Sequence, residues 1–174
     1  RSGHIDFAIL VMRPGYKGAI LPQDKFSVTR LAGFQDIFIA GNDFSDLAGR
    51  SVTPGELCGY PFICMEPGTV TRQFLDDFLL QFHLAVSPDI ELATTDLITP
   101  MAANNLGVGF VPRAFARSAL EEGSVFQIRL TEIVPEREIC VISRTDTPLS
   151  LAGNAFLRLF SDFAEPSCIK KDCR

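Results

Sequence analysis

The chain of 174 residues is long enough for one ordinary domain or two small lobes, since domains usually span about 100–200 residues. Apolar residues make up 47% and charged residues 21%, which excludes a disordered chain, and the modest 13 Gly and 11 Pro exclude collagen-like or low-complexity structure. No apolar run approaches the roughly 18 residues needed to cross a bilayer, so we expect no membrane span.

The net charge of −5, from 16 basic and 21 acidic residues, argues against nucleic-acid binding by this chain itself. The one basic run, Lys170-Lys171, is followed at once by Asp172. No signal peptide is visible at residues 1–6, which predicts a cytoplasmic protein. The chain lacks an initial Met and starts abruptly at a strand-like segment, so we interpret it as a fragment of a longer protein.

The five cysteines are odd in number and irregular in spacing, which argues against a disulfide framework. Cys58, Cys64 and Cys140 lie in apolar runs and are predicted to be small buried side chains. Whether Cys168 and Cys173 form a pair near the end of the chain stays open.

Strands separated by loops are predicted in the first half of the chain, with one clear helix. Residues 5–11 are predicted to form a strand buried on both faces except near Asp6. A half-exposed strand is predicted at 26–31, and buried strands at 37–40 and 61–65. Thr53 can cap a short helix that starts at Pro54. The clearest helix is 70–82, whose apolar face carries Phe74, Leu75, Phe78, Leu79 and Phe82.

The second half of the chain alternates strands with helices. Strands are predicted at 90–93, 108–111, 125–130 and 138–143. A helix over 96–105 is disturbed by Pro100 and closed by Gly107, and a short helix runs from Pro112 to Gly123. Ser150 opens a last amphipathic helix. This alternation predicts an α/β fold with a largely parallel sheet.

No pattern typical of catalysis is present. A metal site or a Ser-His-Asp arrangement would have to use His4 or His83, and His83 is better explained as a surface residue at a helix end. The adjacent pairs Asp76-Asp77 and Glu121-Glu122 are typical of a solvated helix surface rather than of paired acid and base. We therefore expect no enzymatic activity, no catalytic residue, no metal site and no cofactor.

Two segments are candidates for ligand binding. Residues 68–72 place the hydroxyls of Thr69 and Thr71 at the start of a helix that follows a strand, where open α/β sheets bind ligands and where anions are favoured. Residues 94–96 place hydroxyls between the next strand and the next helix. In both segments, helix capping and ligand binding are open alternatives.

Four motifs in order resemble the effector-binding domain of LysR-type transcriptional regulators, over about residues 3–163. They are Gly3-His4-Ile5-Asp6-Phe7-Ala8-Ile9, then Leu47-Ala48 with Leu57 and Tyr60-Pro61-Phe62-Ile63, then Gly107-Val108-Gly109-Phe110-Val111-Pro112, and Leu149-Ser150 through Phe156-Leu157. Asn105 departs from the family pattern, where a Gly generally stands, although Asn tolerates the left-handed conformation at a helix end.

The resemblance implies an α/β fold of the periplasmic-binding-protein type 2, with two Rossmann-like lobes of which the first is incomplete in this chain. Residues 1–10 would end the first lobe and form the crossover strand. Residues 11–134 would form the second lobe, 135–163 the return strand and C-terminal helix, and 164–174 a polar tail. A winged helix-turn-helix would precede this part of the protein.

The same resemblance implies that a small effector binds between the lobes and changes DNA binding by that separate helix-turn-helix. A helix start in the site suggests an anionic effector. The positions carried over from the family are Leu10, Thr69, Val70, Thr71, Thr95, Ile98 and Thr99. The full-length protein would form a homodimer or homotetramer. The alternatives are a solute-binding protein of a transporter and an enzyme built on this fold.

Overall fold

The computed structural model describes residues 5–13 and 24–163. The first residues of the Asp6 motif, His4, the Lys170-Lys171 run, and Cys168 with Cys173 lie outside these ranges. The chain divides into two compact units. Unit 1 comprises Arg1–Phe34 with Glu136–Arg174, and unit 2 comprises Gln35–Pro135.

Unit 2 ends next to the end of the expected second lobe, residue 134, but it starts at Gln35 rather than at residue 11. The reason is strand β2 (Phe26–Phe34). It pairs antiparallel with β9 (Arg137–Arg144) from Phe26 to Phe34. Because β9 belongs to unit 1, the pairing keeps β2 in that unit. Exposed and more buried residues alternate along most of β2, as predicted for a half-exposed strand.

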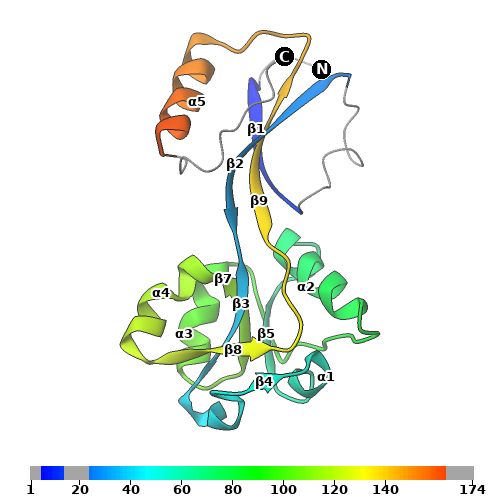
Figure 1. Ribbon diagram of the computed structural model, residues 1–174, viewed down its shortest axis with the longest axis vertical. Helices are drawn as coiled ribbons and strands as arrows, with labels where there is room; N and C mark the ends of the chain where they lie inside the picture. The colour runs from blue at the N-terminus through cyan, green and yellow to red at the C-terminus, as the bar shows by residue number, and fades with distance from the viewer. Residues whose placement is uncertain (1–4, 14–23, 164–174) are drawn as a thin grey trace. The chain divides into compact units, whose positions relative to one another are not determined.

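In its described residues, unit 1 is a three-stranded antiparallel sheet in the order β1-β9-β2 with one helix, α5 (Leu151–Phe163) (Figure 1). The central strand β9 buries Cys140 beside Met12 of β1 (Phe7–Met12). The Phe156 ring of α5 stacks on Phe7 with 5.4 Å between ring centroids. The α5 helix thus covers the beginning of β1.

The expectation that the first strand is buried on both faces is wrong. In β1, Ile9, Leu10 and Val11 are 42%, 46% and 36% exposed. Among the strands of the described ranges, only β9 pairs with β1, which lies at the edge of the sheet. On α5, Leu151 and Leu159 are exposed as well. An apolar sequence indicates a strand here, but among the described residues there is too little cover to bury it.

Unit 2 contains a six-stranded sheet in the order β4-β8-β3-β7-β5-β6. Its strands are β3 (Asp36–Gly41), β4 (Ser51–Val52), β5 (Phe62–Met65), β6 (Ile90–Leu92), β7 (Val108–Pro112) and β8 (Val125–Leu130). β3 is antiparallel to β7 and β8, whereas the other pairs are parallel. The sheet is therefore mixed rather than largely parallel, because β3 runs antiparallel to both of its neighbours.

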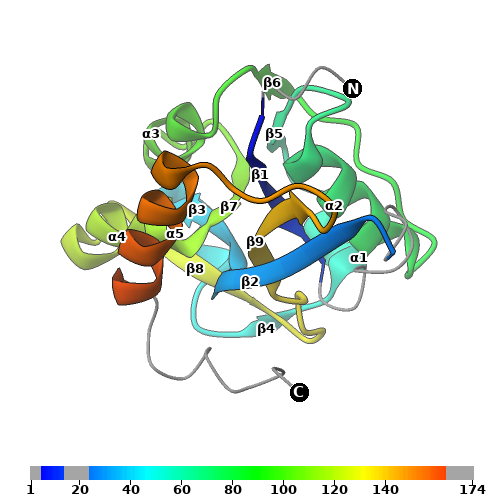
Figure 2. The same cartoon turned by 90° about the horizontal axis from the view of Figure 1, so that it is seen from above.

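Helices cover both faces of this sheet (Figure 2). They are η2 (Asn42–Leu47), α1 (Pro54–Leu57), α2 (Val70–Leu80), η3 (Thr95–Leu97), α3 (Ile98–Ala103) and α4 (Arg113–Glu122). Alternate residues of β3 serve the two faces: Phe38 packs with α1 and α2, and Ile37 with α3 and α4. In the described ranges no helix is both long and apolar enough to span a bilayer.

The predicted helix caps are largely confirmed. Thr53 caps α1 through its hydroxyl, which accepts from the Glu56 N–H at 3.2 Å, and Pro54 is the first helical residue. The α2 helix ends at Leu80, two residues earlier than predicted, because His83 adopts a left-handed conformation with φ 58°. The His83 side chain is exposed, as expected for a residue at a helix end.

The predicted helix over 96–105 is instead a 3₁₀ turn, Thr95–Leu97, followed by the short helix α3. Pro100 is the third residue of α3, where a missing N–H costs no intrahelical hydrogen bond. Asn105 closes the segment with φ 60°, so the left-handed turn expected there is present. The glycines that follow permit close packing: a β-carbon on Gly109 would lie 2.6 Å from Cγ2 of Ile98.

Candidate functional site

The candidate residues of unit 2 lie at the edge of the sheet where β5 and β6 end. Because these strands are parallel, both lead into helical turns at the same edge. Thr69, Val70 and Thr71 begin α2, and Thr95 begins η3. We call these four residues the threonine edge. The Thr95 hydroxyl donates to the Met65 sulfur at 3.5 Å, so it is tied directly to the end of β5.

Thr69 is a helix cap in this structure. Its hydroxyl oxygen accepts from the Arg72 N–H at 3.3 Å and donates its proton to the Glu66 carbonyl at 2.9 Å. A ligand could therefore use a remaining lone pair of this oxygen but not its proton. Val70, the first helical residue, is 55% exposed, so the start of α2 is open to solvent. The unpaired N–H groups and the dipole at the start of an α-helix favour anionic groups.

Arg72 is a feature of this edge that sequence reasoning did not single out. Its Nη1 donates to the Glu91 carboxylate at 2.9 Å and to the Met65 carbonyl at 3.2 Å, and its Nε donates to Asp76 at 3.0 Å. Burial opposes the charged form, but the hydrogen bonds to Glu91 and Asp76 outweigh it and raise the pKa of Arg72. Two carboxylates thus match its charge, and Arg72 ties α2 to β5 and β6. Only the spacing to Asp76 is visible in the sequence.

The other carried-over positions have different surroundings. Ile98 is fully buried in the core beneath α3. Thr99 is 7% exposed, and its hydroxyl donates to the Phe115 carbonyl of α4 at 3.2 Å. Leu10 is half-exposed on β1 of unit 1. In unit 2, the four residues of the threonine edge therefore lie at one edge of the sheet. The Ile98 and Thr99 side chains are buried instead, in the core and against α4.

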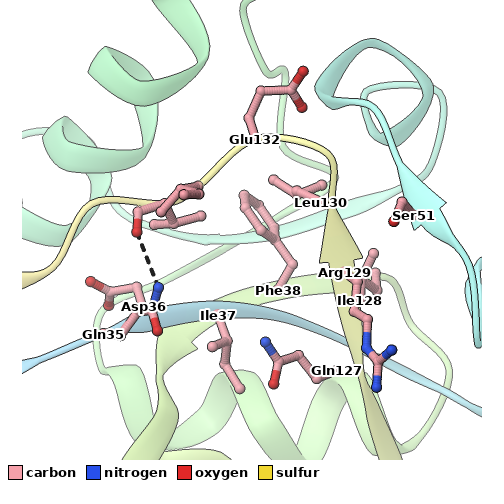
Figure 3. A pocket seen from close by; sticks show the side chains of 12 residues that line it. Gln35, Asp36, Ile37, Phe38, Ser51, Gln127, Ile128, Arg129, Leu130 and Glu132 are labelled. Carbon is pink, nitrogen blue, oxygen red and sulfur yellow. Dashed lines mark hydrogen bonds between the residues drawn. The ribbon is translucent and has the colours of Figure 1, made fainter.

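A cavity of about 330 Å³ lies at the same edge of the sheet, where β8 ends and β3 begins (Figure 3). The ladder between these strands stops at Phe38 and Ile128, while both strands continue beyond that pair. β8 pairs with β4 along its other edge, so Arg129 and Leu130 have a ladder partner on that edge but none on β3. The lining residues are Gln35, Asp36, Ile37, Phe38, Ser51, Gln127, Ile128, Arg129, Leu130, Glu132, Ile133 and Val134. The end of a ladder has no sequence signal, so the cavity was not predicted.

Free cysteines and acidic groups of the described residues form no reactive or metal-binding cluster. In these ranges there is no group of three or more His, Cys, Asp and Glu side chains that could hold a metal ion. Cys64 and Cys140 are buried and Cys58 is half-buried. Burial raises the pKa of Cys64 to about 12, so this thiol stays protonated at neutral pH.

Comparisons with known proteins found one matching protein family and a relative of similar sequence. The family described as LysR substrate binding domain matches residues 1–165. An uncharacterized HTH-type transcriptional regulator of Escherichia coli (strain K12), YfiE, is 32% identical over 94 residues, which cover 54% of this chain and 30% of that protein. The match thus spans less than a third of the length of this relative.

Solved structures share the fold at low sequence identity. The regulatory domain of CcmR from Synechocystis PCC6803, in complex with 2-PG, has a TM-score of 0.76 and 20% identity, over 94% of this chain and 75% of that one. The effector-binding domain of QuiR, in complex with shikimate, has a TM-score of 0.73 and 14% identity, over 94% and 74%. Full-length HypT from Salmonella has a TM-score of 0.71 and 16% identity, over 93% and 53%.

Proposed function

Because the chain belongs to the family of LysR substrate binding domains, we propose that it is the effector-sensing part of a transcriptional regulator. The observation that carries the proposal is the threonine edge, where two consecutive strand-to-helix connections, one with Thr71 and the other with Thr95, lie at one edge of unit 2. We propose that this edge supplies one wall of the effector site. We propose that Leu10 of unit 1 also contacts the effector.

The proposed effector is a small molecule with oxygen atoms that the threonine edge can bind. Similar domains were solved with 2-PG and with shikimate. Since the charge of Arg72 is already matched by Glu91 and Asp76, any preference for an anion would come from the first N–H groups of α2. Ile98 and Thr99 would support the site through packing rather than touch the effector.

The regulatory step is a shift between conformations. An effector that binds one arrangement of the two units more tightly than another increases the population of that arrangement. We propose that a helix-turn-helix in a further part of the polypeptide binds DNA, that the full protein is a homodimer or homotetramer, and that it acts in the cytoplasm. The similar proteins are regulators, which favours this function over a transporter's solute-binding protein and over an enzyme.

The experiment is a calorimetric titration of the chain with a panel of small oxygen-rich molecules, beginning with shikimate and 2-PG. We expect the double variant Thr71→Val, Thr95→Val to bind the active compound about five- to 150-fold more weakly, because each of the two lost hydrogen bonds contributes about 0.5–1.5 kcal/mol. Thr29→Val, at an exposed position of β2, is the matched control and should bind normally.

Thr69→Ser is a second control, since it keeps both the cap and the hydroxyl. Circular dichroism and thermal melts of each variant check that unit 2 is folded. A double variant that is folded and binds with unchanged affinity would refute the assignment of the threonine edge.

A further inference from the structure

The helix α4 carries its charges at the ends where an isolated helix tolerates them least. A helix dipole favours acidic side chains in the first turn and basic side chains in the last turn. In α4 this order is reversed, because Arg113 is the first residue and Glu121 and Glu122 are the last two. Arg117 precedes Glu121 by four residues, and a pair with the basic residue first is the less favourable order. The charge pattern thus destabilises α4 on its own.

Neighbouring charges do not compensate for this pattern. Within the described ranges, Arg117, Glu121 and Glu122 form no ion pair, although all three side chains are exposed. The Arg113 guanidinium donates to the neutral Gln127 side chain, at 2.6 Å from its carbonyl oxygen, and pairs with no carboxylate of these ranges. The four charges of α4 are therefore available to a partner.

Carboxylates are abundant in unit 2, which makes the lack of one beside α4 informative. The unit has thirteen acidic and only five basic side chains. Arg50 pairs with Glu56, and Arg72 pairs with Asp76 and Glu91. The arginines of α4 are thus not paired within a unit that pairs Arg50 and Arg72.

The outer face of α4 permits the close approach of another helix. α4 lies at the outside of unit 2 (Figure 1), where Ala116 and Leu120 pack into the core with α3. Ala114 and Ser118, one turn apart on the opposite side of the helix, are exposed. Phe115 is 52% exposed and adds an apolar side chain beside them. Because helices pack more closely where the contacting side chains are small, this face suits a second helix.

We propose that α4 packs antiparallel against α4 of a second copy of this chain. The basic start of each helix then lies beside the acidic end of the other, and Arg117 pairs with Glu121 of the second copy. Two-fold symmetry forms this ion pair twice. Arg113 lies beside the last carbonyl groups of the facing helix, where its dipole is negative. The contact uses no residue of the threonine edge, so it is independent of the proposed effector site.

The balance of charges favours a second copy over a polyanion such as DNA. α4 presents two arginines and two glutamates, so a polyanion would be repelled by the acidic half of the helix. A copy turned end to end matches both halves. One helix of ten residues from each copy forms a small interface, so we expect a weak dimer.

Sedimentation velocity of the chain over a range of concentrations tests the contact. We expect a dimer at low salt whose dissociation constant rises at least about tenfold between about 0.01 M and 1 M NaCl, because the screening length falls from about 30 Å to about 3 Å. A chain that stays monomeric at low salt up to about 1 mM would overturn the proposal.

Charge reversals locate the contact on α4. Arg117→Glu and Glu121→Arg should each weaken dimerisation at least about tenfold, because each places like charges opposite one another. An equimolar mixture of the two variants should form a heterodimer, since positions 117 and 121 of the two copies again carry opposite charges. Arg158→Glu makes the same charge change at an exposed position of α5 and should leave the dimer unchanged.

Circular dichroism of each variant checks that unit 2 is folded. Dimerisation that is unchanged in both single variants would place the contact elsewhere, for example on the exposed apolar residues of β1, and would overturn the proposal. A mixture of two folded variants that remains monomeric would overturn it as well, because the reciprocal pairing would then be absent.

Discussion

Replacing Phe78 by Ala tests which face of α2 is buried. Phe78 is 2% exposed and lies in the core shared by the sheet with α1 and α2. Its ring is 6.3 Å from that of Phe38 on β3 and 5.4 Å from that of Phe82, measured between centroids. The substitution therefore removes a buried side chain and two aromatic contacts together.

The expected cost follows from these contacts. Truncation of a buried Phe to Ala costs about 3–5 kcal/mol, and the two ring contacts favour the upper half of that range. With a urea m-value of about 2 kcal/mol per M for a unit of this size, a loss of about 4 kcal/mol lowers the unfolding midpoint by about 2 M. Leu80 of the same helix is 64% exposed, so Leu80→Ala should change stability by no more than about 0.5 kcal/mol.

Urea titration followed by circular dichroism measures both variants against the unchanged chain. A loss below about 1 kcal/mol for Phe78→Ala would show that the core beneath α2 is assigned to the wrong face, since no buried Phe is removed so cheaply. The same conclusion would follow if Leu80→Ala proved equally costly.

Two further measurements check packing and charge. Gly109→Ala should destabilise the fold by about 1–3 kcal/mol in urea titration, because the new β-carbon would lie 2.6 Å from Ile98. Gly55→Ala on α1, whose new β-carbon would make an ordinary contact of 3.9 Å with Thr53 Oγ1, should instead stabilise it by about 0.5–1 kcal/mol. Hydrogen bonds from Arg144 hold the pKa of Asp146 at about 2, below its ordinary 3.8. The associated stabilisation is present above pH 3.8 and lost as pH falls toward 2. An NMR titration should show the Asp146 midpoint near 2, and a return toward 3.8 in Arg144→Gln.

The sequence was most informative where local chemistry decides the structure. Thr53 and Pro54 specify the start of α1, and the Phe stripe specifies the buried face of α2. It was less informative where distant segments decide the outcome. The direction of β3 within its sheet depends on β7 and β8, and the exposure of β1 depends on how many strands flank it. Neither quantity is encoded in the residues of the strand itself.

The same distinction applies to the site. Sequence reasoning singled out the two hydroxyl-bearing segments one by one, and the parallel pairing of β5 with β6 places both at one edge of the sheet. The sequence could not show that the Thr69 hydroxyl donates its proton to the Glu66 carbonyl. It also could not show that Glu91 of β6 forms an ion pair with Arg72 of α2. It also gave no sign of the cavity, which lies where the ladder between β3 and β8 ends while both strands continue.

Unit 2 is one continuous segment whose two ends are neighbours, since Gln35 is hydrogen-bonded to Val134 at 3.1 Å. Across the same junction, unit 1 pairs Phe34 with Arg137. A segment with adjacent ends can be cut out, or exchanged for the corresponding segment of a homologue, without separating the strands that flank it. Unit 2 is thus suited to exchange as a whole segment. A single recombination event would replace its ligand-binding residues, while β2 and β9 of unit 1 stay paired.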